Sequence, residues 1–180
     1  MLLLQGECAY RLPEKRESGL KLLNDLEKLV TDKESALTVN SVPLFQIELL
    51  KGKLCDSLKR FEDSSKHFKQ SLETYSKSKV FPQSGQVLGN LQFRYGWSLI
   101  RSKASLDEGL DLLKLADSNL KNNFDLKVKM AQIFSQEKHD IEQAITYIEG
   151  ALRIKPTEPD ALLMHAKLLM KIEEYSLSIE

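Results

Sequence analysis

The side chains in this sequence that could carry catalytic or metal chemistry are three histidines and two cysteines. His67, His139 and His165 do not pair at metal-ligand spacing, and Cys8 and Cys55 form no C-x-x-C motif. The sequence contains no nucleophile elbow, phosphate-binding loop or dinucleotide glycine motif. We therefore predict no catalytic residue, no metal site and no cofactor, and we expect that the protein is not an enzyme.

The charge balance of the sequence gives no overall attraction to nucleic acid or to an anionic membrane. Lys and Arg number 26, and so do Asp and Glu, which makes the formal net charge zero. The most basic stretch, from Lys51 to Arg60, contains Asp56 and is followed by Glu62 and Asp63. Because this face has mixed charges, we predict no nucleic-acid partner.

Hydropathy and cysteine usage indicate where the protein works. No apolar stretch approaches the roughly 20 residues that span a bilayer, so we expect no membrane insertion by this chain. Two cysteines without a disulfide framework favour a reducing compartment. The sequence therefore predicts a cytoplasmic location, with the nucleus possible.

The elements that position these side chains repeat along the chain as pairs of helices. From Asp125 to Pro156, apolar residues at helical spacing precede a polar turn at residues 136–140, and a second apolar stripe follows the turn. This unit is about 34 residues long, which is a known period of helical repeat proteins. Repetition at that period predicts stacked helix pairs.

The second helix of this unit carries a family pattern. Ala144, Ile148, Ala151 and Pro156 follow the pattern A-x-x-x-F-x-x-A ending in proline, which resembles the second helix of a tetratricopeptide repeat (TPR). Small residues let the helices of a pair approach closely, and the larger residue fills the space beside them. The resemblance implies an all-α fold, a TPR-like α-solenoid of antiparallel helix pairs wound into a right-handed superhelix. We expect about nine helices and a partial tenth.

Matched positions recur through the rest of the chain. In the second helices the small position is held by Gly19, Ser64, Gly109, Ala144 and Ser178, and the large position by Leu23, Phe68, Leu113 and Ile148. In the first helices the small position is held by Gly6, Gly52, Gly96, Gln132 and Ala166. Glycine costs about 1 kcal/mol relative to alanine inside a helix, so we expect close helix packing to offset that cost.

The repeat boundaries follow from these positions. We predict a single TPR-like helical domain over residues 1–180, with approximate repeats at 1–40, 43–80, 83–122, 125–156 and a truncated 159–180. Residues 31–41 and 77–83 are the expected long connections. The last repeat is expected to turn at Glu173–Tyr175 and to stop inside its second helix. We therefore expect a fragment or short variant of a longer helical array; a complete protein with frayed ends is the alternative.

A second, local resemblance covers residues 93–103. This stretch reads FRYGWSLIRSK and is similar to F-x-Y-A-W-x-L-[IV]-R-S-K in the first repeat helix of the tail-anchored mitochondrial and peroxisomal fission adaptor. The resemblance implies an adaptor for organelle membrane fission machinery. The alternative is that these aromatic and small residues only pack one helix pair.

The TPR resemblance also implies a binding surface, because the first helix of each pair lines a concave groove that suits an extended peptide or a helix. The family's groove positions map onto Leu49, Lys53, Phe93, Trp97, Arg101, Lys129, Ile133 and Lys167. Trp97 and Arg101 are the strongest anchor candidates, since aromatic and Arg side chains often dominate interfaces. Packing between repeats is the alternative role for both.

The same resemblance allows one binding mode to be excluded. TPR proteins that hold chaperone C-termini share a Lys/Asn clamp for the terminal carboxylate. Lys129 has the matching position, but Ile133 replaces the asparagine, and Leu49 and Phe93 replace the lysine in earlier repeats. We predict no chaperone carboxylate clamp. The function that we favour is a non-enzymatic protein–protein interaction scaffold or adaptor; a structural subunit of a larger complex is a further alternative.

Overall fold

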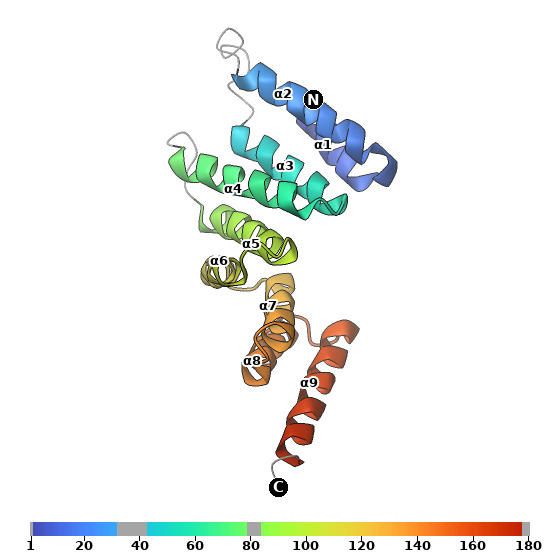
Figure 1. The fold of residues 1–180 in the computed structure, drawn as a ribbon, viewed down its shortest axis with the longest axis vertical. Helices are drawn as coiled ribbons and strands as arrows, with labels where there is room; N and C mark the ends of the chain where they lie inside the picture. Colours follow the sequence, from blue (N-terminus) through green and yellow to red (C-terminus); the bar gives the residue numbers. More distant parts are fainter. Residues whose placement is uncertain (1, 32–42, 79–83, 178–180) are drawn as a thin grey trace. The chain divides into compact units, whose positions relative to one another are not determined.

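The computed structural model describes residues 2–31, 43–78 and 84–177, and these residues form α-helices joined by short turns (Figure 1). The helices are α1 (Leu2–Arg11), α2 (Arg16–Thr31), α3 (Leu44–Ser57), α4 (Phe61–Lys77), α5 (Gly85–Arg101), α6 (Leu106–Asn119), α7 (Phe124–Gln136), α8 (Ile141–Ile154) and α9 (Pro159–Leu177). A short 3-10 helix, η1 (Pro13–Lys15), joins α1 to α2. The described residues include no β-strand, which confirms the all-α prediction.

The chain divides into two compact units: unit 1 covers residues 1–119 and unit 2 covers residues 120–180. Unit 1 consists of the pairs α1/α2, α3/α4 and α5/α6, drawn from blue to yellow-green in Figure 1. In unit 2, α7 pairs with α8, and α9 packs on α8. These helix pairs confirm the predicted TPR-like solenoid architecture. That all five repeats make one domain stays a prediction.

The helices of the unit 1 pairs meet where the sequence places its small residues. A Cβ atom added at Gly52 of α3 would lie 2.5 Å from the Phe68 ring of α4. A Cβ atom added at Gly96 of α5 would lie 2.7 Å from the carbonyl oxygen of Gly109 on α6. The predicted wedging of these glycines against a neighbouring helix is therefore confirmed, and it explains why glycine is tolerated inside helices.

The other matched positions of the second helices also lie in the core. Leu23, Phe68, Leu113 and Ile148 are all buried. Two serines of α4 replace apolar contacts with hydrogen bonds to α3: Ser64 Oγ donates to the Gly52 carbonyl at 3.0 Å, and Ser71 Oγ donates to the Phe45 carbonyl at 2.7 Å. These bonds satisfy hydroxyls that would otherwise be buried without partners.

The predicted turn at Glu173–Tyr175 was wrong. Helix α9 continues through these residues to Leu177. The stretch contains neither glycine nor proline, and adjacent glutamates alone do not end a helix. Ala166, expected at a packed contact, is exposed, because α9 contacts α8 through buried residues such as Ala161 and Leu168. Ser178, Pro82 and most of the two predicted connections lie outside the described residues.

Candidate functional site

The first helices of the three unit 1 pairs enclose a hollow of about 650 Å³. We call it the unit 1 groove. Its apolar wall is formed by Leu3, Leu4, Leu49, Leu50, Val87 and Leu91, and its polar lining includes Glu7, Gln46, Lys53, Asn90 and Arg94. These residues recur at three- and four-residue steps, so each helix presents one face to the groove.

Two cations line the groove, Lys53 and Arg94. Among the described residues, neither Lys53 of α3 nor Arg94 of α5 forms an ion pair or a side-chain hydrogen bond. Burial lowers the pKa of Lys53; the nearby Arg94 charge lowers it further, and Glu7 opposes the shift. Burial also lowers the pKa of Arg94, against the influence of Tyr10 and Asp56. The groove therefore holds two partly desolvated like charges.

The structure distributes the predicted site residues of unit 1 over two places. Leu49 and Lys53 line the groove. Phe93 and Trp97 are partly buried on α5, and Trp97 lies one turn beyond Arg94 on the same helix face. Arg101, one further turn along, donates to Asp56 Oδ1 at 2.7 Å and stacks over the Phe61 ring, with 4.0 Å to its centroid.

The α5 residues of the groove were not found by sequence reasoning. Mapping the family's positions selected Phe93 and Trp97, whereas the groove face carries Val87, Asn90, Leu91 and Arg94. The helical spacing of Val87, Leu91 and Arg94 could have indicated that they share one face of α5. The sequence alone, however, does not show which face of α5 turns toward α3.

Unit 2 has a smaller hollow of about 320 Å³ between α7 and α9. Lys167 lines it, together with Val128, Gln132, Leu163 and Lys171. The other two predicted residues of this unit lie elsewhere. Lys129 donates to Gln132 Oε1 at 3.4 Å, and Ile133 is buried between the helices. Partner binding by these residues stays a prediction.

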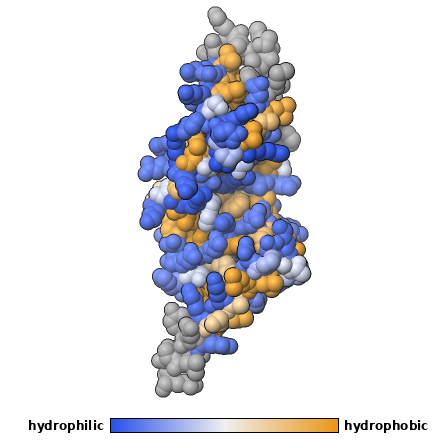
Figure 2. All heavy atoms as spheres, turned by 90° about the vertical axis from the view of Figure 1, so that its right-hand side faces the viewer, coloured by the Kyte–Doolittle hydropathy of each residue, from blue (hydrophilic) through white to orange (hydrophobic). Residues whose placement is uncertain are grey.

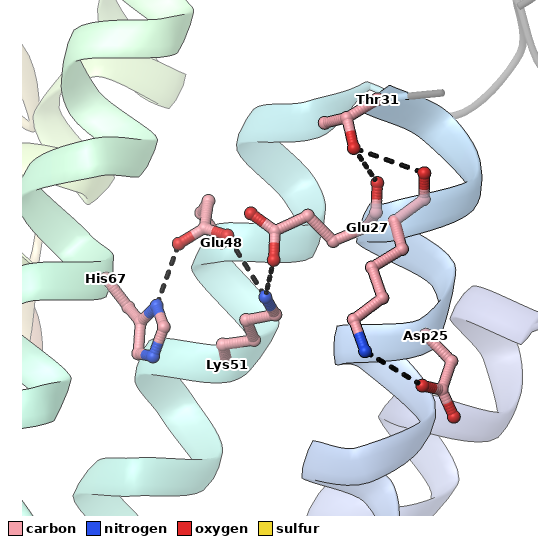
Figure 3. Close-up of polar contacts among 7 residues, drawn as sticks. Asp25, Glu27, Thr31, Glu48, Lys51 and His67 are labelled. Carbon is pink, nitrogen blue, oxygen red and sulfur yellow. Dashed lines mark hydrogen bonds and ion pairs between the residues drawn. The ribbon is translucent and has the colours of Figure 1, made fainter. Parts of the chain in front are cut away.

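A row of alternating charges crosses unit 1 behind the groove. Figure 3 shows Glu48 and Lys51 of α3 between Glu27 of α2 and His67 of α4. Lys51 is only 2% exposed; it pairs with Glu27 and lies 3.4 Å from Glu48 Oε1. His67 Nδ1 lies 2.8 Å from Glu48 Oε2. The row ties three consecutive helices together.

The pKa values of His67 and Glu48 are shifted in the directions that keep both side chains charged. Burial alone would lower the pKa of His67, but hydrogen bonds to Cys55 and Glu48 outweigh it and raise that pKa to about 9. Burial would raise the pKa of Glu48, yet His67 and Lys51 hold it below its usual value. At neutral pH the histidine is therefore cationic and Glu48 is anionic.

Cys55, His67 and Glu48 are residue types that can form a nucleophile, a base and an orienting acid. The Cys55 side chain, however, is 3% exposed, so a substrate has no access to its sulfur. Sequence reasoning missed the burial of Lys51 and Glu48, because a Lys and a Glu three residues apart usually lie on a solvated helix face.

One face of the molecule carries scattered apolar patches (Figure 2). On the side of the molecule drawn in Figure 2, hydrophobic patches are separated by hydrophilic ones. In the part of the chain that the structure describes, no cluster of three or more His, Cys, Asp or Glu residues could hold a metal ion. None of the described helices is both long and apolar enough to cross a membrane.

Comparison with known proteins gives matches to solved structures. No protein-family model matches the sequence, and no curated protein matches it. The Cut9–Hcn1 hetero-tetramer of the APC/C contains a chain with a TM-score of 0.65 at 16% identity, covering 89% of this chain and 29% of that one. This chain therefore spans less than a third of that protein.

Other matches cover most of both chains. MamA AMB-1 has a TM-score of 0.65 at 12% identity and covers 97% of this chain and 84% of its own. YrrB, described as a TPR protein with an unusual peptide-binding site, has a TM-score of 0.58 at 14% identity and covers 88% and 77%. The thermophilic TPR protein TTC0263 of Thermus thermophilus has a TM-score of 0.54 at 16% identity and covers 94% and 97%. The chain therefore has the fold of tetratricopeptide-repeat proteins.

Proposed function

We propose that this protein is a non-enzymatic scaffold that binds a segment of a partner protein in the unit 1 groove. The observation that carries the proposal is the groove itself, an apolar wall that the first helices of three consecutive pairs build together. A concave surface between stacked helices is the place where repeat proteins bind their partners.

The size and lining of the groove fit a short segment of protein. A hollow of about 650 Å³ lies within the range of about 300–1,000 Å³ that binding pockets occupy. Leu4, Leu49 and Val87 would contact apolar side chains of the segment, and Gln46 and Asn90 can donate or accept hydrogen bonds at its backbone. The fold-level likeness to YrrB, a protein described as having a peptide-binding site, supports this class of ligand.

A displayed library of random peptides would test the proposal. Peptides selected on the wild-type protein should lose most of their affinity for Leu49→Glu, because a buried carboxylate would oppose the apolar contact. The matched control is Leu115→Glu, since Leu115 is exposed on α6 and lies outside the groove. Thermal unfolding checks that both variants fold. Equal loss of affinity in both variants, or no selected peptides, would refute groove binding.

Trp97 supplies a second test on the same peptides. As an anchor on the α5 face, Trp97→Ala should weaken binding by about tenfold or more while leaving the melting temperature nearly unchanged. As a packing residue, it should instead lower the free energy of unfolding by several kcal/mol, as truncation of a buried aromatic does. The balance of the two effects assigns its role.

A structural subunit of a larger assembly is the second candidate, and α9 favours it. Leu162, Leu163, Leu169 and Met170 of α9 are between 44% and 61% exposed. Exposed apolar surface of this kind marks contact with another protein. Size-exclusion chromatography of cell extract at high salt would decide: a permanent subunit stays in a large assembly, whereas a scaffold with exchangeable partners elutes near its own mass.

A further inference from the structure

We propose that the segment bound in the unit 1 groove carries an internal acidic residue between apolar residues, and that Lys53 and Arg94 hold its carboxylate. This inference rests on the proposed function. It names the chemistry by which the groove would select its partner.

The two cations face the groove from neighbouring first helices. Lys53 follows Leu49 by four residues on α3, and Arg94 follows Leu91 by three residues on α5. Each cation therefore stands one helical turn beyond an apolar contact on its own helix. The Arg94 charge is close enough to lower the pKa of Lys53, so one carboxylate could contact both side chains.

Three other cations that link the unit 1 pairs already have acidic partners. Arg60 pairs with Glu17 at 2.7 Å, Arg101 pairs with Asp56 at 2.7 Å, and Lys51 pairs with Glu27. Lys53 and Arg94 lack such a partner among the described residues. Two partly desolvated like charges that no carboxylate contacts directly are unfavourable, and an incoming anion would relieve that cost.

The charge of the groove fits a single carboxylate. Glu7 of α1 also lines the groove and raises the pKa of Lys53, so the three side chains carry a formal net charge of +1. Asp56 acts on Arg94 but is already paired with Arg101. One bound carboxylate would bring the groove to neutrality, and the planar Arg94 guanidinium can bind it with two parallel hydrogen bonds.

Apolar surface on both sides of the cations favours an internal acidic residue over a C-terminus. Leu3 and Leu4 of α1 line the groove on one side of the α3 cation, and Val87 of α5 lines it on the other side. A segment that fills this surface needs apolar side chains on each side of its acid. A terminal carboxylate would leave one side uncovered.

The test uses peptides selected from the random library on the wild-type protein, with affinities from fluorescence anisotropy. Replacing the acid of a selected peptide by its amide should weaken binding about tenfold, the usual effect of losing a charge-assisted hydrogen bond. Lys53→Gln and Arg94→Gln should have effects of the same size, and they should not add to the amide substitution. Lys69→Gln, which removes an exposed charge from α4, should leave affinity unchanged.

The outcomes separate this inference from the proposed function. Selected peptides that need Leu49 but tolerate the amide without loss would overturn the inference and leave groove binding intact. Loss of affinity on amidating the peptide C-terminus would assign the carboxylate to a chain end and also overturn it. If sedimentation instead shows a dimer that Arg94→Gln dissociates, a second copy of this chain occupies the groove, and the inference is overturned as well. Failure to select any groove-dependent peptide would overturn both proposals.

Discussion

In unit 1 the helices of a pair meet at glycines and serines, whereas in unit 2 the α7/α8 pair meets at alanines and larger apolar residues. Gly52 and Gly96 are pressed against the next helix, and Lys51 and Glu48 are buried on the same helix as Gly52. Among the buried polar side chains of the described residues, only Ser135 belongs to unit 2. Within the described residues, unit 1 therefore buries many more polar side chains than unit 2.

The helix starts differ in the same way. In unit 2, Asn123 caps α7 by accepting a hydrogen bond from the Leu126 amide at 2.9 Å, and Asp140 caps α8 by accepting from the Gln143 amide at 3.0 Å. The α3, α4 and α5 helices of unit 1 begin without a side-chain cap, and only at α6 does Ser105 Oγ accept from the Glu108 amide, at 3.3 Å, among the caps described for this unit. Capping residues in the local sequence help to define where α7 and α8 begin. In unit 1, the helix positions depend more on contacts between helices.

The largest expected effect is at the buried charge row of unit 1. Lys51→Met should lower the free energy of unfolding by about 3 kcal/mol, because Glu48 would be left buried with one fewer cation. Urea unfolding measures the loss. Lys171→Met on the exposed face of α9 is the unit 2 control and should change stability by less than about 0.5 kcal/mol. Similar small losses at both sites would remove the distinction between the units.

The glycine contacts come next. Gly96→Ala should lower the free energy of unfolding by about 1–2 kcal/mol, because the added Cβ would meet the Gly109 carbonyl and outweigh the gain in helix propensity. Gly85→Ala is the matched control at the start of α5, where the Cβ would lie 3.4 Å from Asn119 Oδ1. Thermal unfolding compares the two, and stabilisation by both would show that α5 and α6 are not held by close approach.

Stability should also depend on pH through unit 1. The pKa of His67 is raised from 6.5 to about 9 in the folded chain, so its contribution is fully present below pH 6.5 and is lost as pH rises to about 9. The expected loss is about 1–2 kcal/mol, reduced by the partial exposure of the ring. Urea titrations across this range should show the decline in wild type, and His67→Gln should flatten it. If the free energy of unfolding of His67→Gln falls with pH as steeply as that of wild type, a group other than His67 causes the pH dependence.

The smallest expected effect lies in unit 2. Gly150→Ala on α8 should raise the free energy of unfolding by about 0.5–1 kcal/mol, since the added Cβ would meet only the flexible Lys127 side chain at 3.2 Å. The opposite signs of Gly150→Ala and Gly96→Ala would sharpen the comparison. Destabilisation at Gly150 would show that unit 2 is packed as tightly as unit 1.

The sequence predicted the helix pairs because their determinants are local. Gly52, Gly96 and Gly109 recur at matched places among apolar stripes, and close helix approach is what glycine inside a helix offers. The prediction of a turn at Glu173 was wrong, because polar residues without glycine or proline do not end a helix. The burial of Lys51 escaped prediction, because it depends on α2 and α4 covering α3 from two sides.

The candidate site was predictable only in part. Leu49 and Lys53 followed from the family's groove positions, and both line the unit 1 groove. Arg94 did not, because its role depends on which face α5 turns toward α3. That orientation depends on packing between helix pairs, where Phe45, Tyr75 and Leu91 form one buried cluster. No sequence pattern within α5 indicates it.

Hydrogen–deuterium exchange on the whole chain, with and without a selected peptide, tests most directly whether the unit 1 groove is the partner-binding surface. Binding there should slow exchange in α3 around Leu49–Lys53 and in α5 around Leu91–Arg94, while exchange in α9 stays unchanged. Protection confined to α7 and α9, with α3 and α5 unaffected, would contradict the account.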